Sequence, residues 1–214
     1  MKYQIVPVTP FQQNCSVLWC EETNKAAVVD PGGDIDRILN VIKKEGLTLE
    51  KILLTHGHID HVGAADTLAK SSGLPIIGPH KADQFWLDNL SGQSKNFGFL
   101  PVEPFTPTQY LEAGDKVTVG EQTLQVLHCP GHTPGHVVFY SDKDKRVWVG
   151  DVLFRGSIGR TDFPQSNHQD LIQSITKVLW PLGNDVEFVP GHGPVSTFGI
   201  ERQSNPFVAD QLFE

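Results

Sequence analysis

The sequence lacks the features of proteins that bind nucleic acids or anionic membranes. Its 17 Lys and Arg residues are outnumbered by 25 Asp and Glu residues, which gives a formal net charge of −8, and the basic residues form no block. Because phosphates and anionic lipids attract clustered positive charge, we expect neither a nucleic-acid nor a membrane partner. No apolar run approaches the roughly 20 residues that span a bilayer. The first residues also lack the charged start and apolar stretch of a signal peptide.

Cysteine is scarce, with only Cys15, Cys20 and Cys129. An odd and sparse set argues against a disulfide framework, so we predict that the protein works in a reducing cytoplasm. Hydrophobic residues make up 39% and charged residues 20% of 214 residues, which is typical of a soluble globular protein. The length fits one large α/β domain, and we expect residues 1–214 to form it. The sequence leaves the oligomeric state open.

The pattern of apolar residues predicts two similar runs of elements. Strands at 2–8, 15–20 and 25–30 are followed by a helix at 34–45, a strand at 49–55, a helix at 62–72, a strand at 75–78 and a helix at 81–90. Strands resume at 116–119, 123–128, 137–141 and 146–149, before a helix at 168–180 and a strand at 186–189. This order predicts two halves packed sheet on sheet with helices outside.

One long segment, residues 91–108, shows no periodicity and is rich in Gly, Pro and Phe. A loop of this length in a compact domain is usually functional or disordered. Its aromatic residues favour a flap near the site, and a plain surface excursion is the alternative.

The most informative stretch is Thr55–His61, which places three histidines and an aspartate after the apolar pair Leu53-Leu54. A strand that ends in a tight turn at Gly57 would aim these side chains at one point. Imidazole nitrogens and a carboxylate that converge in this way suit a divalent ion of the zinc or iron type. An exposed polar turn is the alternative, and the further donors downstream argue against it.

Three later apolar runs also end in His or Asp beside glycine. They lead to His132, Asp151 and His192, each directly after a glycine. One such site would be weak evidence, because a histidine at a strand end is most often solvated. The four sites together predict a metal centre where the strand ends meet.

These motifs resemble those of the metallo-β-lactamase superfamily of hydrolases. The matching segments are Thr55-His56-Gly57-His58-Ile59-Asp60-His61, Gly131-His132, Gly150-Asp151 and Gly191-His192-Gly193. Within that superfamily, Asp30-Pro31-Gly32, the 130–136 segment and the 150–154 segment resemble the short bacterial-type glyoxalase II proteins, which are hydroxyacylglutathione hydrolases. The resemblance implies an α/β fold, the four-layer αββα sandwich, with the metal site at one edge of the two sheets.

The resemblance also implies a set of metal ligands. One metal would be held by His56, His58 and His132, the second by Asp60, His61 and His192, and Asp151 would bridge them. Zinc is the expected metal, at one or two ions per chain, and the mixed nitrogen and oxygen donors also accept iron or manganese. Metal binding lowers the pKa of water to about 7, so hydroxide would attack a thioester carbonyl. Asp60 could also orient that hydroxide as a catalytic residue.

The implied substrate is S-D-lactoylglutathione or a related acyl-glutathione thioester, as in methylglyoxal detoxification. Larger glyoxalase II enzymes bind glutathione partly through a C-terminal helical extension, and only 22 residues follow His192 here. We therefore expect the extension to be missing. Arg155 and Arg160, shortly after Asp151, are candidate ligands for a substrate carboxylate. Ion pairs with Asp162 or glutamates are the alternative for these arginines.

Several other residues carry weaker expectations. Cys129 is not expected to bind metal, because the histidine set is complete without it. His136 is expected to support packing or the metal ligands, and His80, His128 and His168 to lie in loops or on the surface. Asp30 could orient a ligand or simply form a turn.

A second reaction class is also open. The segment Gly159–Phe163 resembles the persulfide dioxygenases, which oxidise glutathione persulfide with a single iron, here at His56, His132 and Asp151. Against this alternative, His136 stands where those enzymes carry cysteine. β-Lactam hydrolysis fits less well, because no secretion signal is present and Asp60 accompanies His61. A non-enzymatic binding module fits least, since it has no use for a hydroxide-generating site.

Overall fold

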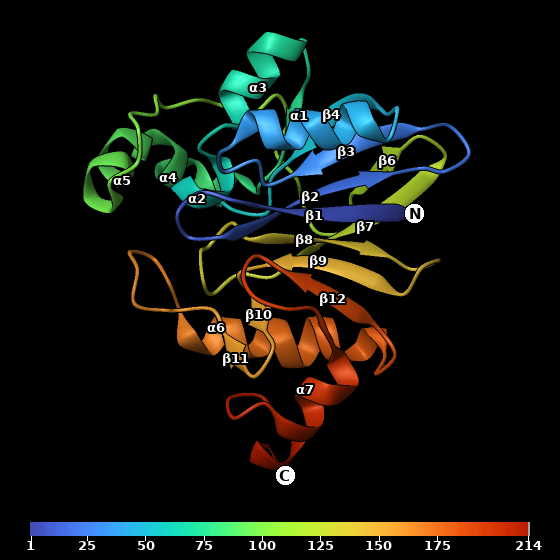
Figure 1. The fold of residues 1–214 in the computed structure, drawn as a ribbon. Coiled ribbons are helices and arrows are strands. Elements are labelled where there is room, and N and C mark those ends of the chain that lie inside the picture. Colours follow the sequence, from blue (N-terminus) through green and yellow to red (C-terminus); the bar gives the residue numbers. More distant parts are fainter. Residues whose placement is uncertain (214) are drawn as a thin grey trace.

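The computed structural model describes residues 1–213 and places two β-sheets face to face between outer helices (Figure 1). The first sheet contains, in spatial order, β1 (Lys2–Val8), β2 (Gln13–Trp19), β3 (Lys25–Val29), β4 (Thr48–Leu53) and β5 (Ile76–Ile77). The second contains β13 (Ser196–Thr197), β12 (Glu187–Pro190), β9 (Arg146–Gly150), β8 (Val137–Ser141), β7 (Gln122–His128) and β6 (Lys116–Val119).

The helices form the two outer layers. Helices α1 (Ile35–Lys44) and α3 (Ala65–Ser72) cover the first sheet, and α6 (His168–Gln173) and α7 (Phe198–Ser204) cover the second (Figure 1). Helix α6 continues through a π-helical stretch, η2 (Ser174–Leu179), into the 3₁₀ turn η3 (Trp180–Leu182). The predicted four-layer αββα sandwich is therefore confirmed.

Shorter elements connect these layers. They are α2 (Ile59–Val62), η1 (Lys81–Asp83), α4 (Gln84–Asp88), α5 (Leu90–Phe97), the hairpin β10 (Leu153–Phe154) with β11 (Ser157–Ile158), and the final turn η4 (Asp210–Leu212). No helix within residues 1–213 combines the length and apolar character needed to cross a membrane.

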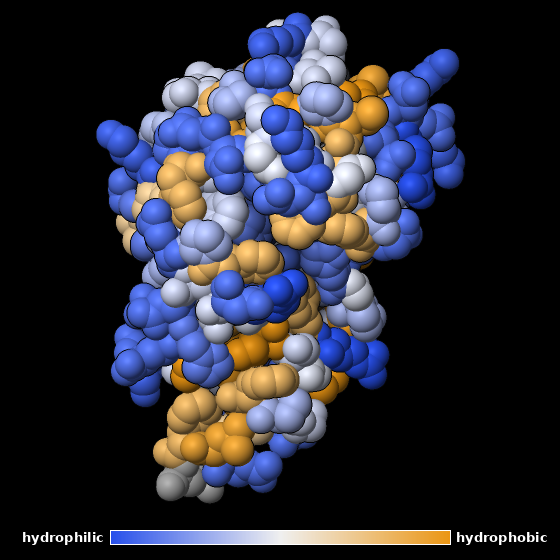
Figure 2. Space-filling view, turned by 90° about the vertical axis from the view of Figure 1, so that its left-hand side faces the viewer, coloured by the Kyte–Doolittle hydropathy of each residue, from blue (hydrophilic) through white to orange (hydrophobic). Residues whose placement is uncertain are grey.

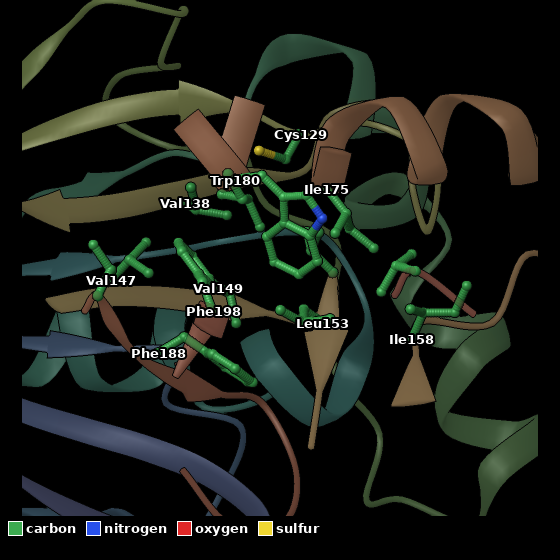
Figure 3. Close-up of a cluster of buried hydrophobic side chains, with 14 of the residues drawn as sticks. Cys129, Val138, Val147, Val149, Leu153, Ile158, Ile175, Trp180, Phe188 and Phe198 are labelled. Carbon is green, nitrogen blue, oxygen red and sulfur yellow. The ribbon is translucent and has the colours of Figure 1, made fainter. Parts of the chain in front are cut away.

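The central strands β3, β8, β9 and β12 are buried on both faces, and this explains their unbroken apolar runs in the sequence. Strands β6 and β7 instead expose every second residue over most of their length. In β8, Val137 and Phe139 pack between the two sheets, while Val138 and Tyr140 pack against the outer helices. The cluster under those helices includes Trp180, Ile175, Phe188 and Phe198 (Figure 3). The two sheets thus pack on one shared apolar interior.

The segment 91–108 differs from the expected loop, because its first residues form helix α5. Ser91, Gly92 and Ser94 are poor helix formers, so the sequence gives no helical signal. Tertiary hydrogen bonds stabilise the helix instead: Ile59 N donates to Gln93 Oε1, and Gln93 Nε2 donates to the carbonyl oxygens of Gly57 and Trp86.

Strand direction brings the expected site residues to one edge. Strand β3 pairs parallel with β4, and β9 pairs parallel with β12, so within each sheet their carboxyl ends share an edge. The loops that follow β4, β7, β9 and β12 carry His56, His132, Asp151 and His192, respectively. The topology alone therefore assembles residues that lie more than a hundred positions apart.

Truncation of Phe188 should destabilise this frame strongly. The ring is fully buried in β12 and stacks on Phe198, with ring centroids 5.8 Å apart. We expect Phe188→Ala to lower the free energy of unfolding by about 3–5 kcal/mol, since it leaves a cavity in the core. Urea denaturation measures this loss. The control Phe207→Ala, at a side chain that is 46% exposed, should cost much less, and equal costs would contradict this account of the core.

Candidate metal centre

The structure brings all seven expected metal ligands together at this edge. Six of the seven are buried and the last is partly exposed: His56, His58, Asp60, His61, His132, Asp151 and His192. Donor atoms of His56, His58 and His132 lie within 4.8 Å of one another, and so do those of Asp60, His61 and His192. These are the two groups that the family resemblance implied.

In the first group, three ring nitrogens converge. His58 Nδ1 lies 3.1 Å from His56 Nε2 and 2.9 Å from His132 Nε2. The Nδ1–H of His132 donates to the carbonyl oxygen of Arg160 at 2.8 Å. This bond fixes the tautomer of His132 and leaves the Nε2 lone pair of the neutral ring directed at the other two rings.

The second group combines nitrogens with carboxylate oxygens. His192 Nε2 lies 3.1 Å from Asp60 Oδ2, and His61 Nε2 lies 3.7 Å from the same oxygen. Asp151 stands between the groups, because its Oδ1 is 3.3 Å from His61 Nε2 and its Oδ2 is 3.6 Å from His132 Nε2. One carboxylate thus reaches both groups.

The donor set fits divalent cations. Within residues 1–213, His58 Nε2, His61 Nε2 and Asp151 Oδ1 are buried atoms without a hydrogen-bond partner. An unsatisfied buried polar atom is costly, so its presence in a native fold calls for an explanation. For His61 Nε2 and Asp151 Oδ1, which lie 3.3 Å apart, a bound cation would supply the missing partner.

The pKa directions at the site agree with this fit. Burial lowers the pKa of His56 and His58 well below the usual histidine value, which keeps both imidazoles in the neutral form that binds metal. Burial acts on His61 in the same direction, but the carboxylates of Asp151 and Asp60 outweigh it and raise its pKa. Burial would raise the pKa of Asp151, yet the facing histidines hold its carboxyl below the usual range. A cation can take the place of that proton on His61.

Asp30 both orients His61 and forms a turn. The sequence analysis offered these two roles as alternatives, and the structure shows both. Its Oδ1 accepts the backbone N–H of Thr55 at 2.8 Å, and its Oδ2 accepts the Thr55 hydroxyl at 2.6 Å. The same Oδ2 lies 2.8 Å from His61 Nδ1. A hydrogen bond at Nδ1 directs Nε2 of His61 toward the centre. The backbone of Asp30 has φ 53°, as in a tight turn.

Asp83 links the two histidine loops, a role that the sequence analysis did not predict. Its carboxylate is fully buried and accepts the backbone N–H of Gly57 at 2.8 Å, the Thr133 hydroxyl at 2.8 Å and the backbone N–H of Gly135 at 2.6 Å. Burial raises the pKa of Asp83 to about 6. Gly57 lies between His56 and His58, and Thr133 follows His132, so one side chain sets the distance between these loops. No local pattern around position 83 marks it, since its partners are remote in the chain.

Gly191 is required by the crowding at the centre. A Cβ atom at this position would stand 2.1 Å from Asp151 Oδ1 and 2.6 Å from Cε1 of His61. Any side chain would therefore displace the carboxylate between the two groups.

The remaining candidates lie around the centre. His136 is buried, stacks on His56 with centroids 4.6 Å apart, and accepts the backbone N–H of Asp151 at its Nε2. Cys129 packs in the apolar cluster under α6, where burial raises the pKa of its thiol (Figure 3). His80 and His128 stack on each other near the surface, and His168 is exposed at the start of α6.

The two arginines differ in their placement. Arg160 lines the cavity beside the centre and forms two hydrogen bonds to Asp162, at 3.0 and 2.8 Å. Its guanidinium lies 4.6 Å above the ring of Phe163. Arg155 is exposed in the turn between β10 and β11 and is not part of that lining.

A cavity of about 670 Å³ opens next to the donor groups. Besides His58, Asp60, His132, Asp151 and His192, its lining contains five aromatic side chains: Phe11, Trp86, Phe97, Phe154 and Phe163. Figure 2 views the molecule from the side that carries α4 and α5, where hydrophobic residues gather among hydrophilic ones near the middle of the face. Phe97 comes from the 91–108 segment, so that segment does reach the site.

The chain is similar to known metallo-β-lactamase superfamily proteins over most of its length. Residues 8–192 match the family model of the metallo-β-lactamase superfamily. Among curated proteins, the hydroxyacylglutathione hydrolase GloC of Haemophilus influenzae is 44% identical over 97% of this chain and 98% of its own length.

Three solved structures are similar to this chain in both fold and sequence. The B3 metallo-β-lactamase BLEG-1 superposes with a TM-score of 0.88 at 37% identity, over 97% of this chain and 99% of its own. TTHA1623 in a di-iron-bound form gives 0.87 at 36% identity, over 96% and 100%. ETHE1 from Myxococcus xanthus gives 0.79 at 27% identity, over 98% and 85%.

Substitution of Asp83 should weaken metal binding without unfolding the protein. Asp83→Asn keeps the volume but turns an amide N–H₂ toward groups that themselves donate, which loosens both histidine loops. We expect metal affinity to fall about 10- to 100-fold, the usual effect of changing a group that orients metal ligands. Competition with a chromogenic chelator measures it. The control Asp88→Asn, at an exposed carboxylate in α4, should bind as the unchanged protein does, and equal affinities for the two variants would refute this role of Asp83.

Metal removal should destabilise the folded chain. A ligand that binds only the native state at 1,000 times its Kd adds about 4 kcal/mol to the free energy of unfolding. We therefore expect a chelator to lower the melting temperature and added zinc to restore it, as followed by circular dichroism. In His132→Ala the chelator should have a smaller effect. A melting temperature that ignores both chelator and zinc would contradict a metal centre in this cluster.

Proposed function

The chain belongs to the metallo-β-lactamase superfamily and is a hydrolase, and on this premise we propose that it hydrolyses glutathione thioesters, with S-D-lactoylglutathione as the first substrate. The observation that carries the proposal is the double group of donors beside an open cavity, in a chain 44% identical to a hydroxyacylglutathione hydrolase over nearly its full length.

The proposed metal ligands are His56, His58 and His132 for one ion and Asp60, His61 and His192 for the other, with Asp151 between them. Bound metal would supply hydroxide near neutral pH and polarise the thioester carbonyl. We propose zinc, and the same nitrogen and oxygen donors accept iron or manganese. The di-iron form of TTHA1623 supports iron as an alternative.

The protein's own residues would orient and shield the reaction. Asp60 Oδ2 lies 3.1 Å from His192 Nε2 and belongs to the cavity lining, so it can accept a proton from an attacking water and orient it. The rings of Trp86 and Phe163 pack against His58, at centroid distances of 4.6 and 4.8 Å, and exclude water from that side. The departing thiolate is a good leaving group, so no separate general acid is required.

Substrate carboxylates would meet Arg160 at the mouth of the cavity. Its pairing with Asp162 at an exposed position leaves the guanidinium accessible to a second carboxylate. Arg155 would take part only if the β10–β11 turn moved toward the cavity. We further propose that residues 1–214 act as a single domain in the cytoplasm.

A second candidate is a mono-iron glutathione persulfide dioxygenase. Similarity to ETHE1 of Myxococcus xanthus, together with the Gly159–Phe163 segment, favours it. The iron would be held by His56, His132 and Asp151. Against it, His136 occupies the place of a cysteine in those enzymes, and it stacks on His56 as part of the packing around the first group.

Paired assays on the metal-analysed protein distinguish these functions. We expect hydrolysis of S-D-lactoylglutathione and no oxygen uptake with glutathione persulfide. His56→Ala and Asp151→Ala should each reduce hydrolysis by more than about a thousandfold, because they remove several kcal/mol of metal-dependent stabilisation. The control His168→Ala, at an exposed histidine, should retain activity.

Other outcomes would overturn the proposal. One iron per chain with rapid oxygen uptake would assign the chain to the dioxygenases. Folded His56→Ala protein with full hydrolytic activity would show that the reaction does not use this centre. Hydrolysis of a cephalosporin is measured in the same series, because BLEG-1 is described as a B3 metallo-β-lactamase.

A further inference from the structure

We infer that the cavity beside the donor groups selects thioesters with a bulky apolar acyl group, such as an aromatic 2-hydroxyacyl group, over the small lactoyl group. This inference rests on the proposed thioester hydrolysis and concerns the acyl half of the substrate. It follows from the shape, the lining and the charge of the cavity.

The wall nearest the first donor group is aromatic. Phe163 lies 4.8 Å from the His58 ring and 5.6 Å from the His132 ring, and Trp86 lies 4.6 Å from His58. Phe163 and Trp86 meet edge to face at 6.2 Å. A carbonyl placed at these histidines would therefore carry its substituent along apolar ring surface.

The outer wall exposes apolar surface that a small acyl group would leave uncovered. Phe11 and Phe97 meet edge to face at 6.0 Å and are 44% and 45% exposed. Large exposed apolar side chains that gather at a cavity typically mark a binding surface. The lactoyl group offers one methyl to a cavity of about 670 Å³, whereas a phenyl group covers ring surface along it.

The cavity offers little to the charged half of the substrate. Glutathione carries two carboxylates, and within residues 1–213 the lining contains a single Lys or Arg side chain, that of Arg160. Asp162 binds this guanidinium at Nε and Nη2, so Arg160 can meet one substrate carboxylate and leaves the other without a cationic partner in the lining. The interactions that can discriminate between substrates therefore fall on the acyl group.

The buried Gln93 amide in the cavity lining is already engaged with the backbone. The Gln93 amide accepts from Ile59 N and donates to the carbonyl oxygens of Gly57 and Trp86. Both donor positions of Nε2 are therefore used, and the side chain is only 2% exposed, so Gln93 has no N–H to offer a lactoyl hydroxyl. Asn89 and Asn96 lie exposed in the lining, where they can bond the peptide groups of the thiol half.

The first test compares kcat/KM for S-mandeloylglutathione and S-D-lactoylglutathione. We expect the protein to favour the mandeloyl substrate by at least about fivefold, and Phe97→Ala to reduce that ratio by about fivefold, the effect of one aromatic contact. Phe97→Tyr, which keeps the ring, should preserve the ratio. The control is Leu100→Ala, at a side chain that is 85% exposed and outside this lining. It should leave kcat/KM unchanged for both the mandeloyl and the lactoyl substrate. A preference for the lactoyl substrate, or a ratio unchanged in Phe97→Ala, would overturn the inference.

A binding measurement tests the cavity independently of turnover. Isothermal titration compares two thioethers that cannot be hydrolysed, S-benzylglutathione and S-methylglutathione. We expect the benzyl compound to bind at least about tenfold more tightly, and the difference to shrink in Phe97→Ala. Equal affinities would overturn the inference. If the metal-loaded protein hydrolyses neither thioester, the proposed function is wrong, and this binding ratio alone decides whether the cavity selects apolar groups.

Discussion

The structure depends on the convergence of buried imidazoles and carboxylates on two neighbouring points. His61 and His132 each have Nδ1 at hydrogen-bond distance from an oxygen of the protein, which leaves Nε2 directed at the centre. Asp151 lies between the two groups. Such an arrangement is costly without cations, because buried donors and charges need partners. The same arrangement would become stabilising with metal bound, and in the function we propose the same atoms would serve folding and catalysis.

The sheets and the supporting residues keep this arrangement fixed. Parallel pairing of β3 with β4 and of β9 with β12 sets the positions at which the loops begin. Asp30 then holds His61, and Asp83 ties the loop of His56 and His58 to the loop of His132. The aromatic cavity opens on the remaining side, so the packing that positions the ligands also forms the wall a substrate meets.

Much of this could be predicted from the sequence, and the rest could not for identifiable reasons. The strand-end motifs predicted a metal centre, because His and Asp beside glycine after apolar runs place donors at a sheet edge. The division of the seven donors into two groups came from the family resemblance. Helix α5 was missed, since Gln93 stabilises it through contacts with residues more than thirty positions away. Asp83 was missed for the same reason, and the aromatic wall was missed because Phe11, Trp86 and Phe163 meet only after folding.

The central claim is that this cluster binds catalytic metal. A crystal structure of the zinc-loaded protein, with anomalous diffraction recorded at the zinc edge, tests it most directly. The account predicts an anomalous peak about 2.0–2.1 Å from the converging nitrogens of His56, His58 and His132. A second peak would lie between Asp60, His61 and His192. Zinc bound elsewhere, or no peak within bonding distance of these histidines, would contradict the account.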